Sequence, residues 1–458
     1  MENILAYIFN LLDYIEEINE TVNAIVWGPP FMVLLIGTGL YLSIRLEFFQ
    51  FTHLGHAWRK SFGTIFTRDK SKEKGEITSF QAVSSAMAAT IGVGNIAGVS
   101  TALASGGPGA IFWMWISALV GMATKFGEAA LGVKFRNKNI DGSYSGGVMQ
   151  YIENGLGSPW KFLAVIYALL AGLAAFGIGN MVQANTMAGA LSDFGIPSHV
   201  TGILAIILVG LVTLGGVKRI ASIAAKIVPI MTLLYIAGSL LIIILNFQAM
   251  PATFARIFTD AFTGSAAAGG FAGATVSTAI RYGFARGIFS NEAGLGAASI
   301  VHAQAKNSPT NQGMWGIWEV FIDTIVVATM TSLVILSTGA LEKGESEAAL
   351  AATGFELGLP GPGNVIVLAS LVLFSYTTML TWNFYGEKSW EYILGRKIVV
   401  PYRLIFLVFL FVGSIGGLEL VWGIADTLNG LMAAPNLLAL FILGGVLVKE
   451  KSDYLKKL

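Results

Sequence analysis

Eleven stretches of about twenty mostly apolar residues run through this sequence, with short polar connections between most of them. A helix needs about 20 apolar residues to cross the hydrocarbon core of a bilayer. We place the spans at residues 22–44, 78–104, 109–132, 160–184, 197–216, 221–247, 282–301, 313–339, 364–390, 399–419 and 420–447. The sequence therefore predicts an all-α integral membrane protein of about eleven transmembrane helices.

Charged residues are rarer than a soluble protein of this length can tolerate. Asp, Glu, Lys and Arg make up 12% of the 458 residues, whereas soluble domains carry roughly a quarter. The net charge of +1 gives no electrostatic reason to bind nucleic acid, and the lack of cysteine excludes disulfides and thiolate chemistry. We expect no organic cofactor, no nucleic-acid partner and no obligatory protein partner.

The distribution of Lys and Arg orients the spans. Alternate connections carry the basic clusters Arg45, Arg59, Lys60, Arg68, Lys70, Lys72 and Lys74; Lys134, Arg136 and Lys138; Lys218 and Arg219; and Lys388, Arg396, Lys397 and Arg403. By the positive-inside rule these connections are cytoplasmic. We therefore expect a plasma-membrane protein with its N-terminus outside and its C-terminus in the cytoplasm. Residues 1–20 mix apolar and acidic side chains at helical spacing and predict an amphipathic helix on the membrane surface.

The spans that follow the first divide into two sets of five. Residues 1–77 hold the amphipathic helix, the extra span and a basic loop, residues 78–247 a first repeat, residues 264–447 a second repeat, and residues 448–458 a cytoplasmic tail. Because five is odd, the two sets have opposite topology. Glycine interrupts the opening span of each set, and paired interruptions of this kind indicate the binding site of a transporter.

The opening span of the first set reads Ala-Ala-Thr-Ile-Gly-Val-Gly-Asn-Ile-Ala-Gly over residues 88–98. Unwound backbone at this depth is tolerated only around an internal polar cavity. Its freed N–H groups suit a carboxylate and its freed carbonyl groups suit a cation. A helix-packing motif of small residues is the alternative interpretation.

The opening span of the second set reads Phe-Ser-Asn-Glu-Ala-Gly-Leu-Gly over residues 289–296. A charged group at the bilayer centre costs at least about 2.5 kcal/mol unless it is paired, so the Glu292 carboxylate requires a partner. The candidates are a bound cation, the ammonium group of a substrate, Arg281 or Arg286. An internal salt bridge, or a position nearer the membrane interface, is the alternative.

Other polar and aromatic residues inside spans are candidates for the same cavity. Thr377, Thr378 and Thr381 share one quadrant of a helix, and their hydroxyl groups suit a hard cation such as sodium. Each threonine could instead bond its own backbone. Trp382 shares the face of Thr378 and would restrict the cavity to small ligands, and Phe176 could line it.

Two acidic residues in the eighth span, Glu319 and Asp323, lie four apart on one helical face. They could contribute to a cation site or a gate, although Glu319 could equally lie at the cytoplasmic surface. Lys125 and Glu128 stand near a cytoplasmic helix end and are expected to form an interfacial ion pair.

Two further motifs carry a family resemblance. Gly-Gly-Pro-Gly-Ala-Ile-Phe-Trp-Met-Trp at residues 106–115, continuing through Gly121, resembles the signature of the alanine or glycine:cation symporter family, and residues 290–296 resemble a second block of it. The resemblance extends over essentially the whole chain. It implies the amino acid-polyamine-organocation superfamily, a leucine-transporter-like fold with two discontinuous helices in a five-plus-five inverted repeat, and coupling to sodium or sometimes to protons.

The resemblance also implies site residues. By the resemblance, the substrate would be bound by Thr90, Val93, Gly94, Phe289, Ser290 and Glu292. Phe176, Thr378 and Trp382 join this substrate site as the candidates that their positions inside the spans suggest. Two sodium sites would be formed by Thr90 and Asn95, and by Ala88, Ile91, Thr377 and Thr378. Glu292 departs from the small hydroxyl residue that is common at its place, so it would bind the substrate ammonium or replace a sodium ligand.

These observations predict a sodium-coupled symporter that imports small neutral amino acids such as alanine and glycine by alternating access, and not an enzyme. A proton-coupled symporter, or a transporter of another small polar substrate, is the alternative. A channel would require a continuous polar lining. A membrane enzyme would require a nucleophile beside a base, or a metal cluster, and the sequence shows neither pattern.

Overall fold

The computed structural model describes residues 2–64, 75–140, 142–263, 275–345, 347–416 and 419–457, and these are almost entirely helical. Four residues of the expected basic loop, Arg68, Lys70, Lys72 and Lys74, lie outside the described residues. The first residues of the expected second repeat, 264–274, and residues 417–418 of the expected tenth span also lie outside them.

The helices come in two groups along the chain, with one short hairpin. The first group is α1 Glu2–Val26, α2 Pro29–Arg45, α3 Phe49–Thr52, α4 Leu54–Lys60, η1 Phe62–Thr64, α5 Ser79–Thr90, η2 Gly94–Gly98, α6 Val99–Gly106, α7 Gly109–Lys134, α8 Val148–Leu156, η3 Ser158–Trp160, α9 Lys161–Phe176, η4 Gly177–Met181, α10 Val182–Ser192, α11 Ser198–Thr213 and α12 Gly216–Leu245. The hairpin pairs β1 Asn137–Lys138 with β2 Tyr144–Ser145 in antiparallel fashion.

The second group is η5 Phe247–Ala249, α13 Met250–Thr263, α14 Val276–Asn291, α15 Ala298–His302, α16 Pro309–Val320, η7 Phe321–Ala328, α17 Thr329–Ser337, η8 Ala340–Lys343, α18 Glu347–Gly358, α19 Pro362–Leu394, η9 Arg396–Ile398, α20 Val399–Ile415, α21 Glu419–Leu431, α22 Ala433–Ile442 and α23 Gly444–Leu455. Three of the short elements, η2, η4 and η7, are wide π-helical turns inside longer helices. Such turns often occur at functional sites.

Seven helical runs in the described part of the chain are long and apolar enough to cross a membrane, and two bent helix pairs raise that number to nine. The bent pairs are Asp13–Val26 with Pro29–Arg45, at 40°, and Ser79–Thr90 with Gly94–Gly106, at 49°. The expected span at 197–216 corresponds to the shorter apolar helix α11, and the one at 282–301 to the separate helices α14 and α15. The total of eleven crossings stays a prediction.

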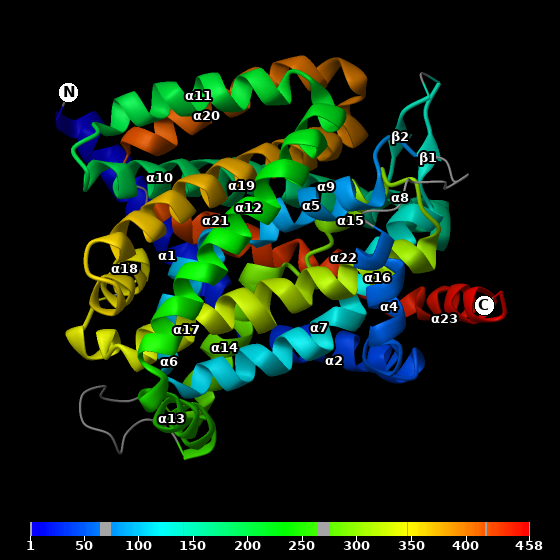
Figure 1. Cartoon of the computed structure of the whole chain (residues 1–458). Helices are drawn as coiled ribbons and strands as arrows, with labels where there is room; N and C mark the ends of the chain where they lie inside the picture. Colours follow the sequence, from blue (N-terminus) through cyan, green and yellow to red (C-terminus); the bar gives the residue numbers. More distant parts are fainter. Residues whose placement is uncertain are drawn as a thin grey trace.

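Helices α13 and α18 lie at one end of the bundle, and α4, α8, α23 and the hairpin lie at the other (Figure 1). His56 of α4 is hydrogen-bonded to Tyr454 of α23 at 2.9 Å, and Lys134 at the end of α7 pairs with Glu450 of α23 at 2.7 Å. Basic residues from connections that we expect in the cytoplasm therefore share one end of the molecule, whereas the orientation of that end stays a prediction.

The first helix reaches further than the sequence suggested. Helix α1 continues to Val26, so the expected first span begins inside it, and the chain bends before Pro29 opens α2. Asn23 in its last turns donates hydrogen bonds to Asp426 at 3.1 Å and to Thr427 at 3.0 Å. The end of α1 is therefore attached to α21, while a membrane-surface location of residues 1–20 stays a prediction.

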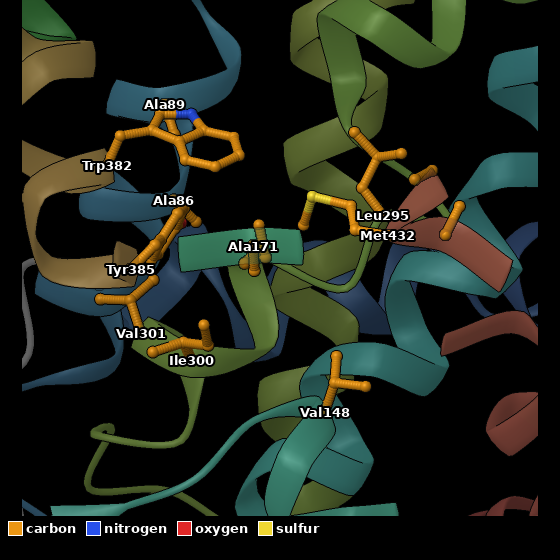
Figure 2. Packing of buried hydrophobic residues seen from close by; sticks show 14 of the residues in the cluster. Ala86, Ala89, Val148, Ala171, Leu295, Ile300, Val301, Trp382, Tyr385 and Met432 are labelled. Atoms are coloured by element: carbon orange, nitrogen blue, oxygen red, sulfur yellow. The ribbon is translucent and has the colours of Figure 1, made fainter. Parts of the chain in front are cut away.

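A buried apolar cluster surrounds the two broken helices. Figure 2 shows part of it, with Trp382 and Tyr385 of α19 directed toward α5, and Leu295 in the segment between α14 and α15. Gly283 and Gly287 of α14 lie so close to α7 that a Cβ on either would collide with it. Small residues of this kind allow helices in a membrane to pack closely, and here they fix α14 against α7.

Candidate functional site

The two broken helices meet at their interruptions. Helix α5 ends at Thr90 and η2 begins at Gly94, while α14 ends at Asn291 and α15 begins only at Ala298. A Cβ on Gly94 would lie 3.1 Å from Ser290 Cα. Glycine at this position is therefore what allows the first break to approach the end of α14.

The second break is produced by left-handed backbone conformations. Glu292 has φ +56°, Gly294 has φ +101° and Gly296 has φ +80°. A non-glycine residue with positive φ is strained, which is uncommon outside turns and functional sites. The helix α14 therefore stops here, with Glu292 as its C-terminal cap.

The Asp323 carboxylate joins the two breaks. Asn95 Nδ2, from the first break, donates to Asp323 Oδ1 at 2.9 Å and to the backbone carbonyl oxygen of Asp323 at 3.0 Å. Ser290 Oγ, from the second helix, donates to Oδ2 at 3.0 Å, and Thr324 Oγ1 donates to the same oxygen at 2.7 Å. Asp323 is completely buried in the π-helical turn η7, so its charge is balanced by oriented donors rather than by water.

The first break is held open by side chains. Asn95 Oδ1 accepts a hydrogen bond from the Gly92 N–H group at 2.9 Å. Thr331 Oγ1, on α17, donates to the Asn95 carbonyl oxygen at 2.8 Å. Two of the backbone groups at the interruption, the Gly92 N–H and the Asn95 carbonyl oxygen, are thus satisfied within the protein, as a membrane interior requires.

Helix α19 lies against the other side of the first break. Thr378 Oγ1 donates to the Ala88 carbonyl oxygen at 2.9 Å, and a Cβ on Gly92 would lie 2.9 Å from the same hydroxyl oxygen. One turn further, Thr381 Oγ1 donates to the Ser85 carbonyl oxygen at 3.0 Å. Hydroxyl and carbonyl oxygens therefore converge where α5 ends.

Two buried oxygens at the breaks have neither a hydrogen bond nor an ion pair among the described residues. One is Thr90 Oγ1, on the last residue of α5, and the other is Glu292 Oε2. Buried polar atoms are almost always hydrogen-bonded, so both atoms indicate a ligand position. Glu292 Oε1, in contrast, accepts a hydrogen bond from Trp382 Nε1 at 3.0 Å.

Arg286, one of the two arginines that the sequence offered as a partner for Glu292, is engaged elsewhere. Arg286 lies 3.5 Å from Asp426 Oδ2, and its guanidinium group is 5.2 Å from the centre of the Phe289 ring. Trp382 is the residue that contacts Glu292, and Gly179 of η4 leaves no room for a Cβ beside its indole.

Two of the expected site residues lie apart from this arrangement. Phe176 packs against Tyr402 and Phe409 of α20, with ring centres 5.3 and 4.8 Å apart. Thr377 Oγ1 donates to the carbonyl oxygen of Leu373 in its own helix at 3.0 Å. These placements give no support to Phe176 as a substrate contact or to Thr377 as a sodium ligand, and both roles stay predictions.

One expectation about charged residues is wrong in part. Lys125 and Glu128 do pair, but not at an exposed interface, because α2, α14 and α16 cover α7 and both side chains are completely buried. Lys125 Nζ lies 3.1 Å from Glu319 Oε1 and 3.9 Å from Glu128 Oε2. Glu319 is likewise fully buried rather than at the surface. The signal was available, since Lys125 and Glu128 fall inside the expected span 109–132.

A cavity of about 550 Å³ leads to the first break from the end of the bundle where α18 lies. It is lined by residues that include Ala97, Asn185, Asp193, Glu347, Asn364 and Trp422. Ala97 belongs to η2, so the cavity reaches the broken helix itself. The lining mixes polar side chains with apolar ones such as Val367 and Leu371, and the polar side chains make the cavity a suitable path for a small hydrophilic molecule.

Comparisons with known proteins agree on one family of sodium-coupled transporters. A model of the sodium:alanine symporter family matches residues 12–458. The sodium/alanine symporter AgcS of Methanococcus maripaludis is 46% identical over 451 residues, covering 97% of this chain and 98% of that protein. The probable sodium/glutamine symporter GlnT of Bacillus subtilis is 35% identical over 449 residues, covering 97% of this chain and 91% of that protein.

The fold has relatives among solved structures. MhsT in complex with L-phenylalanine is similar with a TM-score of 0.55 at 12% identity, over 82% of this chain and 98% of that chain. At this identity the likeness concerns the fold alone. The all-α membrane architecture with a leucine-transporter-like fold, expected from the sequence, is thereby confirmed. The five-plus-five inverted repeat stays a prediction.

The geometry predicts that Asp323 holds the two breaks together. Asp323→Ala would leave the buried donors of Asn95 and Ser290 without their acceptor, and each unsatisfied group costs about 1–3 kcal/mol. We expect a clearly lower midpoint of thermal unfolding for the purified variant in detergent. Asp193→Ala removes an exposed carboxylate and should leave the midpoint unchanged. Equal midpoints for both variants would contradict this role of Asp323.

Proposed function

The chain belongs to the sodium:alanine symporter family, and on that premise we propose that it imports small neutral amino acids such as alanine or glycine together with sodium, by alternating access. The observation that carries the proposal is the meeting of the two broken helices at Asp323. The resulting group of oxygens and helix ends suits a zwitterion bound beside a cation.

The first broken helix supplies the side that would bind the substrate carboxylate. The half-helix that begins at Gly94, with Val93 before it, presents its N-terminal end to the break. The first N–H groups of a helix have no partner inside the helix, and the helix dipole adds partial positive charge there. A carboxylate bound at Val93 and Gly94 would be stabilised by both effects.

The second broken helix supplies the side that would bind the substrate ammonium. Glu292 Oε2 is buried without a hydrogen-bond partner among the described residues, and Trp382 fixes the other oxygen of the same carboxylate. Ser290 and Phe289 lie beside Gly94 at the contact between the breaks. An ammonium group at Glu292 would satisfy the unpaired oxygen and neutralise a charge in the membrane interior.

Two groups of oxygens suit sodium as the co-transported ion. Asp323, Asn95 and the carbonyl oxygen of Thr90 would form the first, in which the Asp323 carboxylate would supply a negative charge. The second consists of the Thr378 hydroxyl and the carbonyl oxygens of Ala88 and Ile91. In support, Thr378 already lies 2.9 Å from the Ala88 carbonyl oxygen across two helices.

Coupling follows from the position of the second sodium site. An ion held by Ala88 and Thr378 would join α5 to α19, and it would therefore favour the arrangement of helices in which these two are in contact. A ligand shifts a conformational equilibrium only through such differential binding. We further propose a plasma-membrane location with the N-terminus outside and the C-terminus in the cytoplasm, so that the cavity beside Ala97 opens outward.

The direct test is uptake of radiolabelled alanine into proteoliposomes that contain the purified protein. We expect saturable accumulation that requires an inward sodium gradient and is reduced by unlabelled alanine or glycine. Accumulation driven equally well by a proton gradient without sodium would favour proton coupling. No sodium-driven uptake of any small neutral amino acid would contradict the proposal.

Thr378→Ala should raise the sodium concentration for half-maximal uptake by about tenfold, which corresponds to about 1.4 kcal/mol. The reason is the loss of the one side-chain oxygen in the second sodium site. Thr381→Ala is a matched control, because it removes the same kind of hydrogen bond to α5 one turn away, at 3.0 Å. Equal sodium activation in both variants would exclude Thr378 as a sodium ligand.

Trp382→Ala should allow uptake of larger side chains such as leucine. The buried indole fills the space between Gly179 and Glu292, and its removal would enlarge the site. Trp390→Ala serves as the control. Trp390 lies on α19 as Trp382 does, but away from the breaks, and its indole donates to the Gly172 carbonyl oxygen of α9 at 3.1 Å. A folded Trp382→Ala variant that still rejects leucine would remove Trp382 from substrate selection.

A further inference from the structure

A completely buried ion pair lies beside the second break and takes no part in the proposed binding of substrate or sodium. Lys125 Nζ of α7 lies 3.1 Å from Glu319 Oε1 of α16 and 3.9 Å from Glu128 Oε2. Burying charges is costly even when they are paired, and apolar residues of similar size are often equally stable. These charged side chains therefore need a role that apolar side chains could not fill, such as hydrogen bonds to particular groups.

Glu128 contacts the backbone that the second break leaves free. Its Oε1 atom accepts hydrogen bonds from the Gly294 N–H at 2.8 Å and from the Gly296 N–H at 3.1 Å. Both glycines have positive φ, which takes them out of the helix and removes their usual acceptors. One carboxylate on α7 therefore replaces two lost helical hydrogen bonds.

Side chains from other helices satisfy the remaining groups of the same segment. Asn436 Nδ2 of α22 donates to Glu128 Oε1 and to the Gly294 carbonyl oxygen, both at 2.8 Å. The Tyr167 hydroxyl of α9 donates to the Leu295 carbonyl oxygen at 3.1 Å. Of the three side chains Glu128, Asn436 and Tyr167, Glu128 is the one that accepts hydrogen bonds from backbone N–H groups of the segment.

The ion pair also reaches the short helix that follows the break. His302 Nε2 of α15 lies 2.9 Å from Glu319 Oε2, and Gln312 Nε2 lies 2.7 Å from His302 Nδ1. Glu319 thus contacts Lys125 with one oxygen and α15 with the other. Lys125, Glu128 and Glu319 together fix the unwound segment and α15 to α7 and α16.

We propose that Glu128 is a positioning residue, whose carboxylate keeps residues 292–297 unwound and thereby directs Glu292 toward the substrate. Lys125 and Glu319 hold the Glu128 carboxylate in place. The transport consequence rests on the proposed function, whereas the shape of the break does not depend on which substrate is carried.

Hydrogen–deuterium exchange of the purified full-length protein in lipid nanodiscs tests the geometry directly, because amide exchange reports local opening. In Glu128→Ala, amides of residues 292–298 should exchange at least about tenfold faster than in the wild type, the ratio expected for losing one charged hydrogen bond. Peptides of α11 and α20 should be unchanged. Glu128→Gln keeps an acceptor oxygen and should give an intermediate rate.

Glu450→Gln is the matched control. Glu450 of α23 pairs at 2.7 Å with Lys134, which lies on α7 as Glu128 does, and this pair is partly exposed. Its exchange at 292–298 should equal that of the wild type. Wild-type protection of this segment in Glu128→Ala would overturn the proposal. An equal increase of the exchange rate in every helix would also overturn the proposal, because it would show that Glu128 only stabilises the fold as a whole. If Glu128→Ala is not recovered folded, Glu128→Gln and Asn436→Ala provide the same comparison.

Transport gives the second readout. In sodium-driven alanine uptake, Glu128→Gln should raise KM about tenfold while the maximal rate changes less, because Glu292 would be misplaced in a folded protein. A fall in maximal rate with unchanged KM would overturn the positioning role. If the wild type carried no amino acid at all, the proposed function would fail, while the exchange measurement would still decide the inference.

Discussion

Inside a bilayer, every backbone hydrogen bond that a helix gives up must be replaced within the protein, and the structure around both breaks follows from this requirement. At the first break, Asn95 accepts from the Gly92 N–H group. At the second, Glu128 accepts from Gly294 and Gly296. Because Glu128 belongs to a different helix from the break that it supports, the unwound form of that break depends on tertiary packing.

The same requirement applies to charge. Two buried carboxylates beside the second break, Glu128 and Glu319, have both oxygens hydrogen-bonded or ion-paired. Glu292 differs, since its Oε2 atom has neither a hydrogen bond nor an ion pair in the described part of the chain. A carboxylate that is fully satisfied fixes structure, whereas one with a free oxygen is available for a ligand. This difference separates the supporting residues from the proposed binding residue.

Particular residues show how far sequence reasoning reached. The threonines of α19 were expected to face a cation site, and Thr378 does meet the Ala88 carbonyl oxygen, but its neighbour Thr377 bonds its own helix. Helical spacing gives the angle between side chains and not which neighbour each one meets. Phe176 was expected to line the cavity because it lies inside a span, and it packs against α20 instead. Lys125 was placed at an interface because it stands near a helix end, and its acidic partner on α16 is distant in sequence.

The sequence by itself determined the membrane class, the family and the location of the two interruptions, because apolar length, glycine and motif order are properties of the chain alone. Only the tertiary structure decided that the interruptions touch, that Asp323 joins them and that a buried ion pair supports the second one. Those contacts unite helices far apart in the sequence. Their formation depends on which helix faces pack together, and a pattern within one segment carries no information about its neighbours in space.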